Sequence, residues 1–163
     1  MGDAYSIMPK SIPKKKVLFL CTGNSCRSQM AEGLLRWLAG DHYEVYSAGV
    51  APSRVHPMAI LVMQELGIDI SGQSSDLVDD YLDEGIEIVI TVCDHARQSC
   101  PVFPGQVERI HWSIVDPFHG WTVEERMIPR YRATRDELRQ RIEKFIEDQK
   151  LEAPRRAKLG QLK

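Results

Sequence analysis

An eight-residue loop that joins two apolar segments constrains the fold of this chain more than any other feature. Residues 17–20 are typical of a short buried strand, and residues 29–39 have the apolar spacing of an amphipathic helix. Where a strand turns directly into a helix, several backbone N–H groups point at one position, with the positive end of the helix dipole behind them. The loop reads Cys21-Thr22-Gly23-Asn24-Ser25-Cys26-Arg27-Ser28. We therefore predict an anion-binding site at this turn.

The side chains of the loop suit both an anion and a nucleophile. Gly23 and Asn24 tolerate the left-handed backbone that a nest of N–H groups requires. Arg27 supplies a planar fork that can hold two oxygens of a tetrahedral anion. The same field lowers the pKa of a nearby thiol, so we expect Cys21 to be a thiolate near neutral pH. Ser28 is expected to hydrogen-bond that thiolate, which is compatible with a role as helix cap.

Strands that alternate with helices predict a single α/β domain with a doubly wound parallel sheet of about four strands. The expected strands cover residues 17–20, 44–49, 86–92 and 107–112. The expected helices cover residues 29–39, 57–66, 75–78 and 123–150, the last of them interrupted near Pro129. We expect residues 1–15 to be a flexible extension, residues 16–150 to form the domain, and residues 151–163 to be a frayed basic tail.

Composition argues against several classes of partner. The formal net charge of the 163 residues is -2, so no bulk field favours nucleic acid or an anionic membrane. No run of about eighteen apolar residues could span a bilayer, and residues 1–16 lack the apolar segment of a secretory signal. We therefore expect a cytoplasmic monomer that binds neither nucleic acid nor membrane.

The spacing of the four cysteines favours catalysis or thiol exchange. Structural disulfides are uncommon in reducing compartments, and Cys-x4-Cys with Cys-x6-Cys fits structural zinc poorly, so we expect no metal site. Cys21 and Cys93 both follow expected strands of a parallel sheet, which places them at the same edge of it. No role is assigned to the histidines at positions 42, 56, 111 and 119.

The segment from Cys93 to Pro101 is predicted to be a redox switch. If it were helical, Cys93 and Cys100 would be separated by roughly 10 Å between Cα atoms. A disulfide needs about 4.4–6.8 Å, so the helix would have to unwind before these two sulfurs bond. We expect the segment to be ordered when reduced and looped out when oxidised. His95 and Arg97 could help to stabilise a thiolate there.

The Cys-x5-Arg-Ser spacing after a strand resembles the phosphate loop of low-molecular-weight tyrosine phosphatases and of the arsenate reductases that share their fold. The stretch from Cys21 to Gly33 resembles the arsenate reductases more closely. The Cys-x6-Cys pair at Cys93 and Cys100 is a feature that thioredoxin-coupled arsenate reductases have and the phosphatases lack. The resemblance covers about residues 16–150.

The resemblance implies a mechanism and a set of site residues. Cys21 would attack arsenate, for which phosphate or sulfate are analogues, and Cys93 would then attack Cys21 to release arsenite. Cys100 would next attack Cys93, and thioredoxin would reduce the resulting disulfide, with no cofactor required. Asp116, in an Asp-Pro pair, resembles the general acid. The oxyanion would be held by the loop residues Thr22, Gly23, Asn24, Ser25, Cys26 and Arg27.

Several alternatives stay open at this point. A low-molecular-weight tyrosine phosphatase would use Cys21, Arg27 and Asp116, and the sequence Phe118-His119-Gly120 resembles the aromatic-bearing loop of those enzymes. A module that only binds oxyanions or senses redox state is the non-enzymatic alternative. Glutaredoxin or another thiol carrier could replace thioredoxin.

Cys26 is either a trap for Cys21 under oxidation or a small buried thiol. Four polar residues match positions at which some relatives bind a monovalent cation: Asn24, Glu32, Ser47 and Asp76. The alternative is that these residues only form caps and turns.

Overall fold

The computed structural model describes the backbone of residues 13–161 and the side chains of residues 13–150. Most of the expected N-terminal extension, residues 1–12, lies outside the described residues, as do residues 162 and 163. No helix among the described residues is long and apolar enough to cross a membrane.

A four-stranded parallel sheet forms the centre of the domain, as predicted. Its strands are β1 (Lys15–Cys21), β2 (Tyr43–Gly49), β3 (Ile88–Thr91) and β4 (Glu108–His111), in the order β2-β1-β3-β4. Residues 17–20 of β1 are fully buried because this strand is central and both faces of the sheet are covered. The carboxyl ends of β1 and β3 therefore lie side by side, at the edge where parallel sheets bind ligands.

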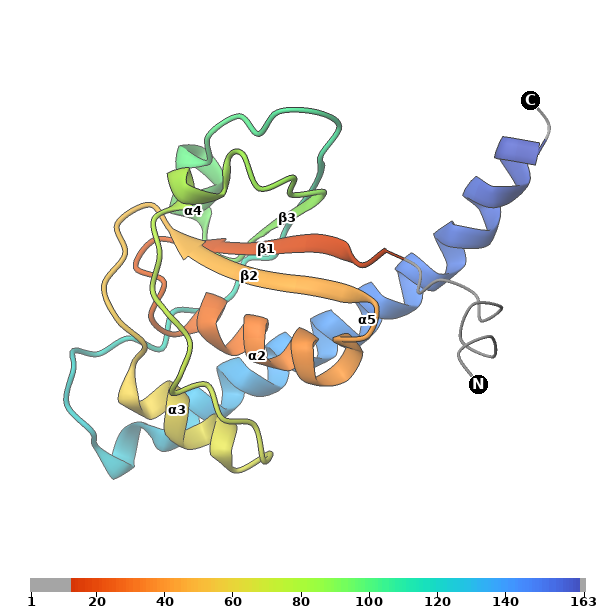
Figure 1. The fold of residues 1–163 in the computed structure, drawn as a ribbon. Helices are drawn as coiled ribbons and strands as arrows, with labels where there is room; N and C mark the ends of the chain where they lie inside the picture. Colours follow the sequence, from red (N-terminus) through yellow and green to blue (C-terminus); the bar gives the residue numbers. More distant parts are fainter. Residues whose placement is uncertain (1–12, 162–163) are drawn as a thin grey trace, which may run out of the picture.

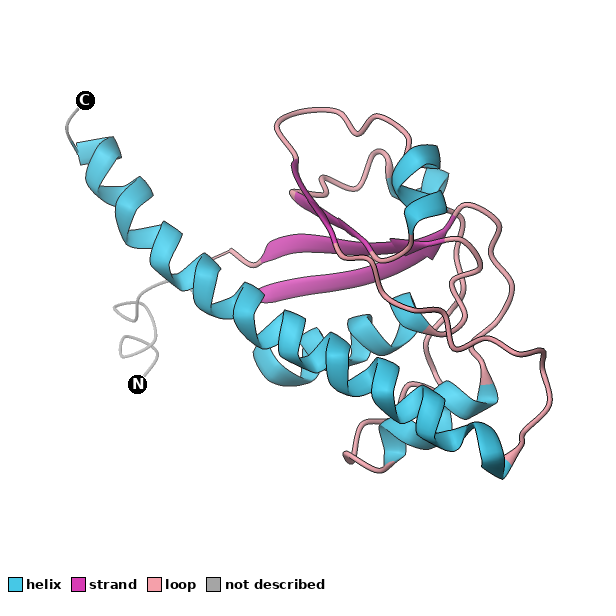
Figure 2. Cartoon of the chain, turned by 180° about the vertical axis from the view of Figure 1, so that it is seen from behind, coloured by secondary structure: helices cyan, strands magenta, loops and turns pink. Residues whose placement is uncertain are grey.

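Helices cover the sheet on both sides (Figures 1 and 2). Helices α2 (Arg27–Ala39), α3 (Pro57–Gln64) and α5 (Ile128–Gln161) lie on one side, and α4 (Asp94–Ser99) lies on the other, near the carboxyl ends of the strands. The predicted buried stripe of the last helix is present, with Leu138, Ile142 and Phe145 buried and Ile146 partly buried against the core.

Helix α5 departs from the predicted bounds at both ends. It begins at Ile128, after a 3-10 turn over Glu125–Met127, so Pro129 lies in the first helical turn, where its missing N–H has no intrahelical partner in any case. The helix continues to Gln161, which corrects the expected end at residue 150. Apart from Pro154, residues 151–159 have moderate to high helix propensity and include no glycine that would end the helix.

The prediction of a short helix at residues 75–78 is also wrong. The chain there is extended, with a bridge between Leu77 and Gly49, and the helical turn is a 3-10 segment over Val78–Tyr81. The reason is tertiary: the N–H of Asp76 donates to Asn24 Oδ1 at 2.9 Å, and Ser75 Oγ donates to the Asn24 carbonyl at 3.0 Å. These contacts tie the segment to the loop after β1.

Candidate active site

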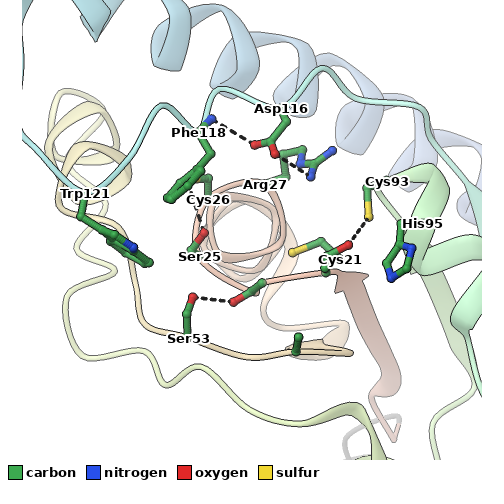
Figure 3. Close-up of a pocket in the computed structure, with 13 residues that line it drawn as sticks. Cys21, Ser25, Cys26, Arg27, Ser53, Cys93, His95, Asp116, Phe118 and Trp121 are labelled. Atoms are coloured by element: carbon green, nitrogen blue, oxygen red, sulfur yellow. Dashed lines mark hydrogen bonds and ion pairs between the residues drawn. The ribbon is translucent and has the colours of Figure 1, made fainter.

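A cavity of about 580 Å3 opens at the carboxyl ends of β1 and β3 (Figure 3). The loop of residues 21–27 forms its floor. The side chains of Cys93 and His95 reach it from the start of α4, that of Asp116 reaches it from the loop after β4, and Phe118 and Trp121 line a further side. The structure thus brings Cys21, Arg27, Cys93 and Asp116 to one cavity.

The left-handed backbone of the loop falls on Asn24 (φ 48°), while Gly23 does not have a positive φ. Asn24 takes this conformation because its buried amide is fully used. Its Nδ2 donates to Ser28 Oγ at 2.8 Å and to Ser47 Oγ at 3.0 Å, and its Oδ1 accepts the N–H of Asp76. Of Gly23 and Asn24, which were both expected to tolerate a left-handed backbone, only Asn24 has one.

The residues that match a cation site in some relatives join one hydrogen-bond network beneath the loop. Ser47 Oγ donates to Glu32 Oε1 at 2.6 Å and itself accepts from Asn24. Arg36 pairs with the other oxygen of Glu32 at 2.6 Å. These contacts fit a network that holds the loop in shape. No cluster of three or more metal-ligating side chains occurs among the residues that the structure describes.

Cys21 is nearly enclosed by the loop. Its Sγ lies 2.8 Å from Ser28 Oγ and accepts the N–H of Asn24 at 3.1 Å, which confirms the contact expected of Ser28. Burial raises the pKa of the Cys21 thiol, while Ser28, Arg27 and the loop amides act in the opposite direction. The expected lowering of this pKa is therefore wrong. The thiol is only 3% exposed, and Arg27 shares its charge with Asp116.

Arg27 and Asp116 form an ion pair across the cavity. Nη2 of Arg27 lies 3.3 Å from Asp116 Oδ2, while Nη1 donates to the carbonyl of Ile114 at 3.0 Å. The other oxygen of Asp116 accepts the N–H of Phe118 at 3.0 Å. The Asp116 side chain is half exposed, so it can exchange protons with solvent while it faces the cavity.

Cys93 lies beside the loop, at the start of α4. Its Sγ accepts the N–H of Ala96 at 3.3 Å, which caps the helix, and lies 3.3 Å from Thr22 Oγ1. Thr22 follows Cys21 directly, so Cys93 contacts the residue next to the first cysteine. The side chain of Thr22 therefore contacts a thiol, a role that sequence reasoning missed because residues 22 and 93 are far apart in the chain.

Cys100 lies at the opposite end of α4 and outside this cavity. Its Sγ accepts a hydrogen bond from Arg109 Nη1 at 3.3 Å, and it lines a separate cavity together with Arg97 and His111. His95 lines the main cavity, whereas Arg97 does not. All four cysteines are free thiols. The chain between Cys93 and Cys100 forms the helix α4.

Cys26 is buried in the loop. Burial raises the pKa of its thiol to about 12, and Ser25 Oγ donates to it at 3.6 Å. These surroundings favour the interpretation as a small buried thiol.

His56 is the buried site residue that sequence analysis left without a role. Its Nε2 donates to the carbonyl of Gly120 at 2.7 Å, its Nδ1 accepts the N–H of Met58 at 3.0 Å, and its ring stacks on Trp121. This pairing requires a neutral ring. Burial accordingly lowers the pKa of His56, and the nearby His119 and Arg54 act in the same direction.

This histidine predicts a pH dependence of stability. An unfolded histidine has a pKa of about 6.5. As the pH falls below that value, the unfolded chain binds a proton at residue 56 before the folded chain does, so the free energy of unfolding decreases. The contribution is fully present above the unfolded pKa. We expect His56→Asn, which keeps a side-chain cap for Met58, to reduce the loss of thermal stability between pH 7.5 and pH 5.5.

The matched control for this prediction is His42→Asn at an exposed turn, which should keep the wild-type slope of melting temperature against pH. An unchanged slope in His56→Asn would contradict the prediction.

Comparison with known proteins agrees with this geometry. The profile of the family described as low molecular weight phosphotyrosine protein phosphatase matches residues 16–157. Arsenate reductases from Halalkalibacterium halodurans and Bacillus subtilis are 46% and 43% identical, over 82% of this chain and 96% of each relative. The chain belongs to the arsenate reductase branch of this family.

Solved structures of the family have the same fold. An arsenate reductase in the phosphate-binding state is 38% identical with a TM-score of 0.65, and an arsenate reductase in the oxidised state is 36% identical with a TM-score of 0.71. Each of these two matches covers 82% of this chain and 98% of the solved chain. A low-molecular-weight tyrosine phosphatase from T. tengcongensis is 29% identical with a TM-score of 0.69. The family and the fold expected from the sequence are confirmed.

Proposed function

We propose that this protein reduces arsenate to arsenite with three cysteines and is regenerated by thioredoxin in the cytoplasm, acting as a monomer. The observation that carries the proposal is that Cys93 lies in the same cavity as Cys21 and Arg27 and contacts the residue next to Cys21. Relatives at 43–46% identity carry the name arsenate reductase, which supports the same substrate. A phosphatase needs no second thiol, so the phosphatase alternative is not favoured.

The first step forms a bond between sulfur and arsenic. The arsenate oxygens are held by the loop amides and by Arg27, and the Cys21 sulfur attacks arsenic while an As–O bond breaks. The leaving oxygen departs as water, so the proton of the Cys21 thiol must reach it. Asp116 is placed to relay that proton because it faces the cavity beside Arg27. The hydrogen bonds from Ser28 and Asn24 stabilise the sulfur once it loses its proton.

The second step transfers two electrons to arsenic. Cys93 attacks the sulfur of Cys21, an S–S bond forms, the S–As bond breaks, and its electron pair stays on arsenic as arsenite leaves. Cys100 then attacks Cys93, which frees Cys21 and leaves a disulfide between Cys93 and Cys100. This exchange requires α4 to unwind and Cys100 to leave Arg109, because the two cysteines flank the helix at its opposite ends.

A coupled assay tests the proposal. Arsenate should drive steady oxidation of NADPH through thioredoxin reductase and thioredoxin when this protein is present. A phosphatase would instead hydrolyse an aryl phosphate without consuming NADPH, and a binding or sensing module would do neither. Replacement of thioredoxin and its reductase by glutaredoxin, glutathione and glutathione reductase should give slower oxidation of NADPH. The proposal fails if no combination of donor and arsenate consumes NADPH.

Substitution of Gly49 should impair this activity through the loop. A Cβ atom at this position would lie 2.5 Å from the Thr22 carbonyl oxygen and 3.0 Å from Asn24 Cβ, so the loop backbone would have to move. We expect Gly49→Ala to lower kcat/KM for arsenate by about 10- to 100-fold, since displacements near 1 Å have effects of that size.

Gly72→Ala is the matched control, because a Cβ atom there has no neighbour within 4 Å and the residue does not have a positive φ. Equal kinetics for the two variants would show that the loop tolerates the displacement.

A further inference from the structure

The cavity is larger than inorganic arsenate needs. A volume of about 580 Å3 is typical of sites for drug-sized organic ligands, which range over roughly 300–1,000 Å3. The anion would occupy only the end formed by Cys21 and Arg27. Beyond that end, Phe118 and Trp121 line the cavity, and we call these two residues the aromatic wall. Phe118 is 41% exposed, so its ring is available for contact.

The aromatic wall is held in place by its surroundings. Trp121 stacks on the buried ring of His56 with centroids 5.1 Å apart and planes 15° apart, and the guanidinium of Arg54 lies 4.3 Å from the Trp121 ring centre. Phe118 meets Trp121 edge-on at 5.3 Å and His56 edge-on at 5.7 Å. A ligand that contacts this wall would have to order few side chains.

The wall and the second thiol lie on opposite sides of the nucleophile. In Figure 3, Trp121 lies on one side of Cys21 and Cys93 on the other, while Asp116 lies beside Arg27. A group bound against the wall would therefore leave the approach of Cys93 to Cys21 free.

We propose that the cavity also accepts aromatic arsonates, in which a ring carbon replaces one oxygen of arsenate, and reduces them with the same thiols. The inference rests on the proposed function. The arsonate oxygens bind the loop and Arg27, and the ring packs on Phe118 and Trp121.

The chemistry balances without a further reactant. Cys21 forms an S–As bond, one As–O bond breaks, and the thiol proton leaves with that oxygen as water. Cys93 then attacks the sulfur of Cys21, the S–As bond breaks and its electron pair stays on arsenic. Pentavalent arsenic is reduced to an arylarsonous acid, the two thiols are oxidised to one disulfide, and the carbon–arsenic bond is retained.

The test uses the full chain and phenylarsonate in single-turnover reactions. We expect one phenylarsonous acid per enzyme, detected by chromatography with arsenic-specific mass spectrometry, and the loss of two free thiols. In the coupled assay, Trp121→Leu should lower the ratio of kcat/KM for phenylarsonate to kcat/KM for arsenate by about five- to tenfold. Phe118→Leu should lower the same ratio, and this variant replaces Trp121→Leu in the test if the tryptophan variant does not fold.

Trp37→Leu is the matched control. Trp37 is 49% exposed on α2 and is also stacked by an arginine, Arg139, but it does not line the cavity. Its substitution should leave the ratio unchanged. The inference is overturned if arsenate is reduced and phenylarsonate is not, or if the wall variants keep the wild-type ratio. Failure with both substrates would overturn the proposed function itself.

Discussion

Replacement of Cys100 by serine should limit the protein to at most one arsenite per enzyme molecule, and replacement of Cys93 by serine should prevent arsenite release. Without Cys93, no thiol beside Thr22 can attack the sulfur that carries arsenic. Without Cys100, the Cys21–Cys93 disulfide persists and the nucleophile is not regenerated. Rapid-quench measurement of arsenite, combined with mapping of disulfides by mass spectrometry, distinguishes the two variants.

Ser99→Ala is the control for this pair, because Ser99 is exposed, ends α4 and directly precedes Cys100. It should sustain many turnovers. Continued turnover in Cys100→Ser with thioredoxin present would contradict the relay, as would the absence of any Cys93–Cys100 disulfide in the oxidised wild-type protein.

Replacement of Arg27 by lysine should lower kcat/KM for arsenate by about 10²–10³-fold, the usual effect of removing one donor that stabilises a developing oxyanion. Lysine keeps the positive charge but loses the planar fork that binds two oxygens. Arg27 also bonds the Ile114 carbonyl and pairs with Asp116, and a single ammonium group cannot replace these contacts and also hold the anion. Steady-state kinetics and phosphate binding by calorimetry measure the effect.

Arg141→Lys provides the matched control. Arg141 lies on α5 outside the cavity and pairs with Glu137 at 3.6 Å between exposed side chains. Its substitution should leave kcat/KM within about twofold of wild type, because exposed ion pairs contribute little. A wild-type kcat/KM in Arg27→Lys would mean that Arg27 acts through its charge rather than through the geometry of its guanidinium, and would contradict the prediction.

The loop of residues 21–28 could be predicted because its determinants are local. A buried strand, a residue that tolerates a positive φ and a helix start follow one another in the sequence, and Asn24 has that positive φ in the structure. The placement of Cys21 and Cys93 at one sheet edge follows from the general rule for parallel strands. The helix over residues 94–99 is not among the helices expected from the sequence.

The sequence by itself determined the sheet, the turn from β1 into α2 and the placement of Cys21 and Cys93 at one sheet edge, since these depend on short-range patterns and on topology. Only the tertiary structure decided how each side chain is used. The raised pKa of Cys21 depends on how deeply the fold buries the thiol. The Thr22–Cys93 contact and the stacking of His56 on Trp121 join residues more than sixty positions apart in the sequence. No local sequence pattern predicts contacts over such separations.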